Sequence, residues 1–112
     1  QYTQKINLKG FLAGIKIHKK NNNYLSFAGN GLSLNINHIF NTKNKSQILH
    51  KMKMLHDYCI KNEFKIYLGK DFFINRKEIL KIYKNSKKFF KTKNKIDPEN
   101  LLVSDFYRRL NS

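Results

Sequence analysis

The sequence predicts an α+β fold in which helices pack on one face of an antiparallel sheet. Three observations carry this prediction. Residues 9–18 alternate between apolar and polar side chains, and residues 32–37 do so again after a polar turn. Residues 47–61 then carry apolar side chains at spacings of three and four, which is the period of a helix. Strands followed mainly by helices are typical of an α+β domain.

The two alternating segments each predict a strand with one polar face. In the first strand Phe11, Ala13, Ile15 and Ile17 share one face, and Lys16 and His18 share the other. In the second strand the polar face carries Ser33, Asn35 and Asn37. Residues 24–27 between them are expected to form a further short strand. A polar row of this kind is either an exposed sheet face or a surface that contacts a ligand.

The second half of the sequence predicts two long helices, one strand and a helical tail. The strand is expected at residues 64–68, after the helix at 47–61. The next helix is expected to begin at Asn75, where Glu78 three residues later completes a capping box, and to run past Phe90. The pair Asp97-Pro98 predicts the N-terminus of a short helix, because Asp is a favoured N-cap and Pro is favoured at the first helical position. A helical tail follows at residues 104–110.

Length and composition fit one domain, but the chain is too short for a complete cofactor-dependent enzyme. The chain has 112 residues and no apolar run near the roughly 18 residues that span a bilayer. It begins without Met or a signal peptide, so we expect a piece of a longer protein. The lone Cys59 is expected to be a buried structural thiol, and it suggests a reducing, cytoplasmic location.

The sequence lacks the common motifs for metal binding, phosphate binding and nucleophilic catalysis. The four His residues are scattered rather than set at metal-ligand spacing, so no metal site is expected. His38, His50 and His56 are interpreted as solvent-facing or partly buried structural residues. No glycine-rich phosphate loop or serine nucleophile elbow is present.

The strong positive charge raises nucleic-acid binding as an alternative function. The net charge is +16, but only Arg76, Arg108 and Arg109 of the 23 basic residues are Arg. Base and phosphate recognition favour Arg, and the Lys residues here are dispersed. We therefore expect no specific nucleic-acid partner, and we expect Arg108 and Arg109 to pair with Asp105 and helix carbonyls. A small basic nucleic-acid-binding module remains the alternative.

Four motifs resemble one enzyme family in the correct order along nearly the whole chain. They are the Phe-Leu-Ala-x-Ile-Lys segment at 11–16, the Leu-Ser-Phe segment at 25–27, the Tyr-x-x-Lys-Asp segment at 67–71 and the Asp-Pro turn with its Ser-Asp-x-x-Arg-Arg-Leu tail at 97–110. Together they resemble the C-terminal part of FAD-linked oxidases of the vanillyl-alcohol oxidase superfamily. The likeness is greatest to the decaprenylphosphoryl-ribose oxidase and sugar-lactone oxidase types.

The resemblance implies a cap domain that covers a flavin held by a separate N-terminal FAD-binding domain. Residues 1–71 would be the substrate-binding cap sheet with one helix, and residues 72–112 would return to the FAD domain. The substrate would be a small hydroxyl-bearing, sugar-like molecule. The fragment alone would hold no FAD and would be inactive.

The resemblance also implies which residues form the site. Lys70 and Tyr67 would lie beside the flavin and the substrate as catalytic and cofactor-binding residues, and Lys16, His18, Ser33 and Asn35 would face the substrate. The decaprenylphosphoryl-ribose type has an aromatic residue, Asn and Cys at the last three of these positions, which leaves the substrate of this protein open. Independently, a Lys charge at the pyrimidine edge of a flavin would stabilise the negative charge that reduction develops.

Overall fold

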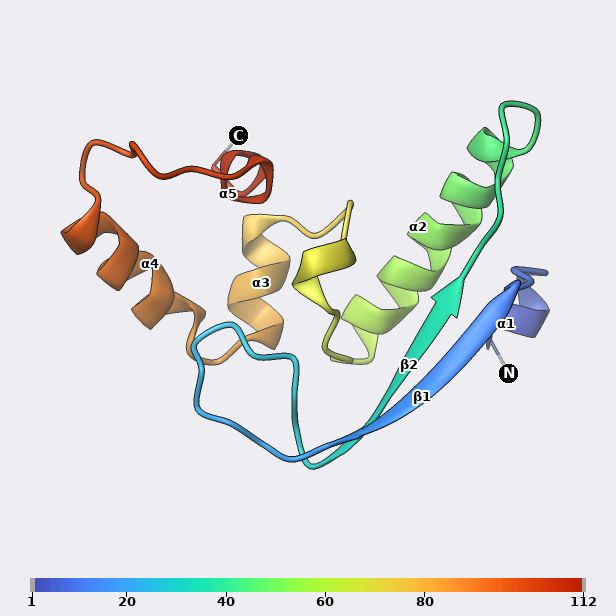
Figure 1. Ribbon diagram of the computed structural model, residues 1–112, viewed down its shortest axis with the longest axis horizontal. Coiled ribbons are helices and arrows are strands. Elements are labelled where there is room, and N and C mark those ends of the chain that lie inside the picture. Colours follow the sequence, from blue (N-terminus) through green and yellow to red (C-terminus); the bar gives the residue numbers. More distant parts are fainter. Residues whose placement is uncertain (1, 112) are drawn as a thin grey trace.

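The computed structural model describes residues 2–111 and shows an α+β chain with a single β-hairpin and five α-helices in that range (Figure 1). In chain order the elements are α1 (Tyr2–Lys5), β1 (Leu12–His18), β2 (Gly31–Asn37), α2 (Lys45–Lys61), the 3-10 helix η1 (Leu68–Lys70), α3 (Arg76–Ile82), α4 (Ser86–Ile96) and α5 (Asp105–Arg109). The α+β class predicted from the sequence is confirmed. None of the helices in residues 2–111 has the length and apolar character needed to cross a lipid bilayer.

The hairpin has one polar and one apolar face, as the alternation predicted. β1 and β2 pair antiparallel from Leu12 opposite Asn37 to His18 opposite Gly31. Because opposite residues of an antiparallel pair share a face, Lys16 and Ser33 lie side by side on the polar face. The apolar face is open to solvent: Ile17 is 85% exposed and Leu32 is 71% exposed.

The predicted strands at 24–27 and 64–68 are not strands. The chain from 19 to 30 instead loops from the hairpin toward α3 and α4, and Leu25 and Phe27 pack against the core. In the second segment the Ile66 carbonyl accepts a hydrogen bond from the Tyr83 hydroxyl rather than from a neighbouring strand. The apolar residues of these two segments therefore pack against other side chains instead of forming strands of a sheet.

The predicted second helix is two helices, α3 and α4. Its start is confirmed: the Asn75 side chain accepts from the Glu78 amide, and the Glu78 carboxylate accepts from the Asn75 amide, at 3.0 and 2.9 Å. The helix stops at Ile82 because Tyr83 turns into an extended conformation and becomes 2% exposed in the core. The α-helical pattern resumes at Ser86, so both helices present apolar side chains to the same core.

The helix predicted to start at Asp97-Pro98 is absent from the described chain. Asp97 instead ends α4, where its carboxylate accepts the amides of Leu101 and Leu102 at 2.8 and 2.9 Å and pairs with Lys93 at 2.5 Å. Asp97 therefore caps a turn rather than a helix. The helical tail predicted at 104–110 does form as α5, with the Ser104 side chain as its N-cap.

The core lies among α3, α4 and α5 rather than under the hairpin. Its buried members are Ile74, Ile79, Ile82, Tyr83, Phe90 and Leu110. Leu25 and Phe27 from the hairpin loop and Leu68 from η1 pack on its edge. This packing fixes the loop that joins the two strands of the hairpin and the 3-10 turn of Lys70. The other predicted site residues, Lys16, His18, Ser33 and Asn35, lie on β1 and β2.

Candidate functional site

The predicted catalytic pair Tyr67 and Lys70 lies on one turn. The Lys70 amide donates to the Tyr67 carbonyl at 3.2 Å, which closes η1, so Lys70 ends a 3-10 turn and not a strand. The Tyr67 ring folds over Gly69, where an added Cβ would come within 2.8 Å of the ring. Both Tyr67 and Lys70 are exposed, and within residues 2–111 the Lys70 ammonium has no carboxylate partner. The turn thus presents an aromatic ring and a free positive charge together.

The polar face of the hairpin contains a hydrogen-bonded pair. His18 Nε2 lies 2.7 Å from Ser33 Oγ across the two strands, and His18 is half-buried. Lys16 stands opposite Ser33 on the same face and is exposed. Asn35 is turned along its own strand, where its amide donates to Asn37 at 3.3 Å. These four predicted substrate-binding residues are therefore neighbours on one sheet face.

Phe27 joins the hairpin to the turn. Its ring packs edge-on against His18 on one side and Tyr67 on the other, with centroid distances of 5.0 Å in both pairs. Edge-to-face pairs at this spacing are favourable geometries for aromatic rings. A hydrogen bond also connects the two segments next to Phe27 and Tyr67, because Lys65 Nζ donates to the Ser26 carbonyl at 3.1 Å. A continuous row of contacts thus links Ser33, His18, Phe27 and Tyr67.

Two shallow grooves flank this row of contacts. One is lined by His18, Phe27 and Phe89 together with residues of the 21–28 loop. The other lies between the turn and α5, and its walls include Leu68, Asp71, Phe72 and Arg109. Both combine aromatic walls with a few polar groups, a composition common in small-molecule sites.

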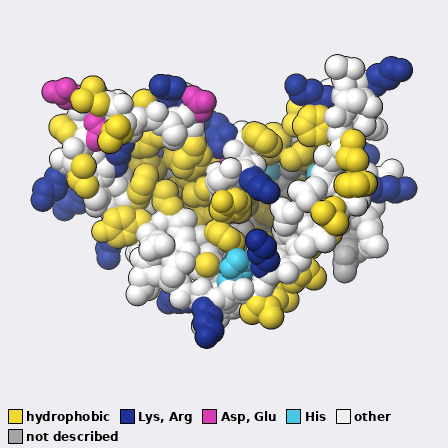
Figure 2. All heavy atoms as spheres, in the orientation of Figure 1, with side chains coloured by type: hydrophobic (Ala, Val, Ile, Leu, Met, Phe, Trp, Pro, Cys, Tyr) yellow, Lys and Arg dark blue, Asp and Glu magenta, His cyan; other side chains and the backbone are white. Residues whose placement is uncertain are grey.

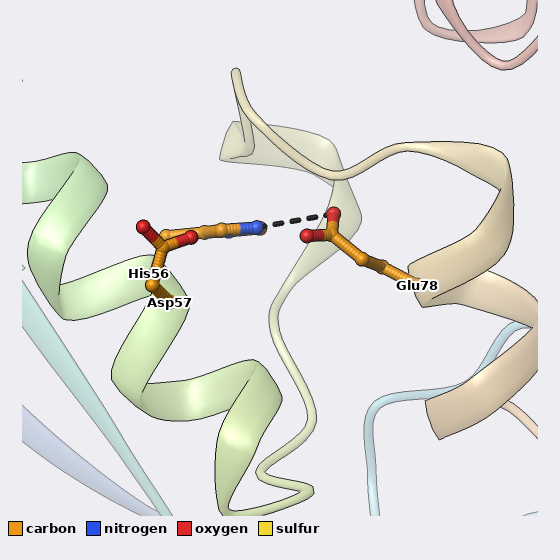
Figure 3. Close-up of side chains that lie close together, drawn as sticks. All are labelled: His56, Asp57 and Glu78. Atoms are coloured by element: carbon orange, nitrogen blue, oxygen red, sulfur yellow. Dashed lines mark hydrogen bonds and ion pairs between the residues drawn. The ribbon is translucent and has the colours of Figure 1, made fainter.

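A buried charge cluster behind the turn was missed by the sequence analysis. His56 on α2 is 5% exposed, and its Nε2 lies 3.2 Å from Glu78 Oε2 (Figure 3). Its Nδ1 lies 3.6 Å from Asp71 Oδ1. Arg109 on α5 pairs with Asp71 at 2.9 Å from the other side. A signal was available, since His56 follows Met52 by four residues and so falls within the apolar stripe of the helix.

The pKa values of the cluster follow from this pairing. Burial alone would lower the pKa of His56, but the Asp71 and Glu78 carboxylates raise it above the usual histidine value. Burial alone would raise the pKa of Asp71, but His56, the amides of Ile74 and Phe73, and Arg109 lower it below the usual range. The cluster therefore favours a protonated imidazole between ionised carboxylates.

The groups around His56 have protein partners of their own. Ligand-type atoms of His56, Asp57 and Glu78 lie within 4.8 Å of one another (Figure 3). Asp57, however, pairs with Lys53 on the exposed side of α2, and Glu78 accepts from the Asn75 amide as well as meeting His56. We interpret the group as an internal ion-pair network.

The other ionisable residues that the sequence singled out lie outside the row of contacts. Cys59 is half-buried, and burial raises the pKa of its thiol, in agreement with a structural role. Arg108 pairs with Asp105 at 2.8 Å, as expected, whereas Arg109 reaches Asp71 instead. His38 and His50 take no part in the row of contacts.

The positive charge is spread over the surface. Figure 2 shows Lys and Arg side chains scattered across the visible face, interrupted by hydrophobic and uncharged groups. A nucleic-acid interface would concentrate basic side chains on one face or along one element. The visible distribution does not favour the nucleic-acid alternative.

Comparison with known protein families gives one match. The model of the family described as D-arabinono-1,4-lactone oxidase matches residues 14–110, which include the hairpin, the turn, the buried cluster and α5. No curated protein and no solved structure matches the chain significantly. The family is an oxidase family of the sugar-lactone type, as the motifs in the sequence suggested. The match extends over nearly the whole chain, and the chain therefore belongs to the D-arabinono-1,4-lactone oxidase family.

Proposed function

We propose that this chain forms the substrate-binding part of a flavin-dependent oxidoreductase that oxidises a hydroxyl-bearing, sugar-like substrate. The observation that carries the proposal is the row of contacts from Ser33 through His18 and Phe27 to Tyr67, which ends on the turn of Lys70. It joins a polar sheet face, which a sugar would require, to an exposed cation, which a flavin ring would require.

The exposed residues of the turn fit the edge of a flavin ring. An exposed Lys70 on the same turn as the exposed Tyr67 ring is suited to an electron-rich heterocycle, and such a charge helps most when it is fixed before reaction. No glycine-rich loop for a diphosphate occurs in the sequence. We therefore propose that a FAD-binding domain encoded by other sequence holds the rest of the cofactor.

Each residue of the row has a proposed role. When bound, the flavin supplies the two-electron acceptor that oxidation of an alcohol carbon needs. Lys70 would hold positive charge where negative charge develops, and Tyr67 would help to place the reacting groups. His18, Ser33, Lys16 and Asn35 would bind substrate hydroxyls, while Phe27 would support the position of His18 and Tyr67.

The C-terminal part is proposed to contact the FAD-binding domain. Leu101 and Leu102 are each 77% exposed on the turn after α4, and Ile96 is 73% exposed beside them. Adjacent exposed apolar side chains of this size favour a protein contact over a free surface. We therefore propose these side chains as a contact surface of the docking part at 72–112, which follows the substrate-binding part at 1–71.

The proposal is tested with the natural protein that carries this chain. It should purify with a flavin absorbance spectrum, and anaerobic D-arabinono-1,4-lactone or a related sugar lactone should bleach that spectrum. The isolated 112-residue chain should give no flavin spectrum when mixed with FAD. A colourless natural protein, or micromolar FAD binding by the isolated chain, would contradict the proposed division of roles.

A further inference from the structure

The turn that presents Lys70 is held from behind by a single buried carboxylate. Asp71 follows Lys70 directly, and its side chain is 3% exposed. Its Oδ2 accepts the amides of Phe73 and Ile74 at 3.1 and 2.8 Å and the Arg109 guanidinium at 2.9 Å. Arg109 also donates to the Asp71 backbone carbonyl at 3.1 Å. Both the side chain and the backbone of the residue next to Lys70 are thus tied to other parts of the protein.

His56 holds the same carboxylate from the opposite side. Its Nε2 faces Glu78 Oε2 at the start of α3 (Figure 3). Its Nδ1 faces Asp71 Oδ1, so the ring joins α2 both to the turn and to α3. Among residues 2–111 the Nδ1 atom has no hydrogen-bond partner, and the nearby Asp71 carboxylate is the charge that offsets its burial. An imidazolium can donate from both nitrogens, and only that form suits two flanking carboxylates.

Apolar packing could stabilise the turn without the buried charges of this cluster. Burying a charge carries a large desolvation penalty, which an ion pair offsets only when its geometry is good. An apolar residue in place of His56 would extend the nearby core without that penalty. What the charges add is direction, because Asp71 is fixed by His56 on α2, by Arg109 on α5 and by the amides of Phe73 and Ile74. The neighbouring Lys70 ammonium has no carboxylate partner within residues 2–111.

We propose that His56, Asp71 and Arg109 are positioning residues that fix the Lys70 turn for the reaction. This inference rests on the proposed function, since it assigns Lys70 the role given above. The three residues do not touch the substrate in this account. They act through the backbone at residue 71. Replacing them should therefore slow only the reaction steps that need Lys70.

The first test measures the turn itself, without any turnover. Hydrogen–deuterium exchange followed by mass spectrometry should show the Phe73 and Ile74 amides exchanging roughly tenfold faster or more in His56→Gln than in wild type. Asp57→Asn is the matched control, because Asp57 is the next residue on α2 but belongs to an exposed ion pair. Unchanged exchange in His56→Gln would overturn the inference.

The second test asks whether the cluster acts through Lys70. In the natural flavoprotein, His56→Gln should slow flavin reduction by between about 10- and 100-fold, the cost of slight misplacement of a reacting group. In a Lys70→Ala background the same change should have little further effect. Equal losses in both backgrounds would show that His56 does not act through Lys70 and would overturn the inference.

Two further variants keep the tests decisive. If His56→Gln does not fold, Arg109→Lys serves instead, because it keeps the charge at a partly exposed position but loses the two-point contact with Asp71. The proposed function fails separately, if Lys70→Ala alone leaves flavin reduction unchanged. The exchange measurement remains informative in that case, because it reports the order of the turn and not the reaction.

Discussion

His18 is the residue through which the two parts of the proposed site meet. It contacts Ser33 through a hydrogen bond and Phe27 through its ring edge, and Phe27 in turn contacts Tyr67. Alternation predicted His18 for the polar face of the first strand and Ser33 for the polar face of the second, and the family resemblance implied that both face the substrate. It could not predict Phe27 as the bridge, because residues 24–27 look like a strand and the bridge depends on a loop that packs on the core.

Replacing His18 tests this role at the scale of one hydrogen bond. His18→Phe keeps a ring against Phe27 but removes the bond to Ser33, so the ring row should persist while substrate binding weakens. Net hydrogen-bond energies of about 0.5–1.5 kcal/mol predict a KM increase of roughly 2- to 12-fold with kcat little changed. Steady-state kinetics with Ile17→Ala as the control, on the opposite face of β1, measures the difference; equal effects in both variants would contradict the role.

The missed cluster shows why single polar residues in an apolar stripe are hard to interpret. The sequence predicts His56 as a solvent-facing or partly buried structural residue, whereas it is buried at 5% exposure. Nothing adjacent in sequence marks its partners. Those partners, Asp71 and Glu78, are 15 and 22 residues away. Only the packing of α2 against the turn and α3 brings them together, and no local pattern encodes that packing.

At the scale of elements, the capping box of α3 was predictable and the helix break after it was not. Asn75 and Glu78 satisfy each other through local bonds, which depend on sequence spacing alone. The break at Tyr83 depends on a hydroxyl bond to Ile66, and the two missing strands likewise depend on contacts with distant segments. The local cap at Asn75 was predicted correctly, whereas the local start signal at Asp97-Pro98 predicted a helix that does not form. Long-range side-chain contacts decided the break at Tyr83 and the two missing strands.

Asn75 and Asn85 offer a matched pair of cap variants. The Asn75 side chain caps α3, whereas Asn85, at the corresponding position of α4, makes no side-chain cap bond. Asn75→Ala should lower the free energy of unfolding by about 1 kcal/mol, a usual cost for losing an N-cap. Asn85→Ala should change it by much less. Urea denaturation of both variants decides the matter, and equal losses would contradict the assigned cap.

At the scale of the whole molecule, the buried cluster should make stability depend on pH. A raised pKa means that His56 contributes fully below its usual value of 6.5 and that the contribution is lost as pH rises through the folded-state value. Asp71 has a lowered pKa, so its contribution is present above its usual 3.8 and is lost as pH falls through the folded-state value. The groups that face His56 are Asp71 and Glu78, with Arg109 behind Asp71 and Asp57 beside it on α2.

The difference in stability between wild type and His56→Gln is expected to change with pH. The stability lost in His56→Gln should be greatest at about pH 5 and should shrink as pH rises above about 6.5, because only the protonated imidazole pairs with the carboxylates. Denaturation curves of wild type and variant at several pH values measure this directly. A loss that is the same at all pH values would mean that His56 is buried in its neutral form.

The central claim is that Lys70 serves flavin chemistry, and one measurement tests it most directly. Stopped-flow reduction of the natural flavoprotein by its sugar-lactone substrate should be slowed about 10²- to 10³-fold by Lys70→Ala, the usual cost of removing one preorganised group beside developing charge. Lys77→Ala is the control, because Lys77 is an exposed lysine on α3 outside the site. The account predicts a large loss in the first variant and none in the second. Unchanged reduction in Lys70→Ala would contradict it.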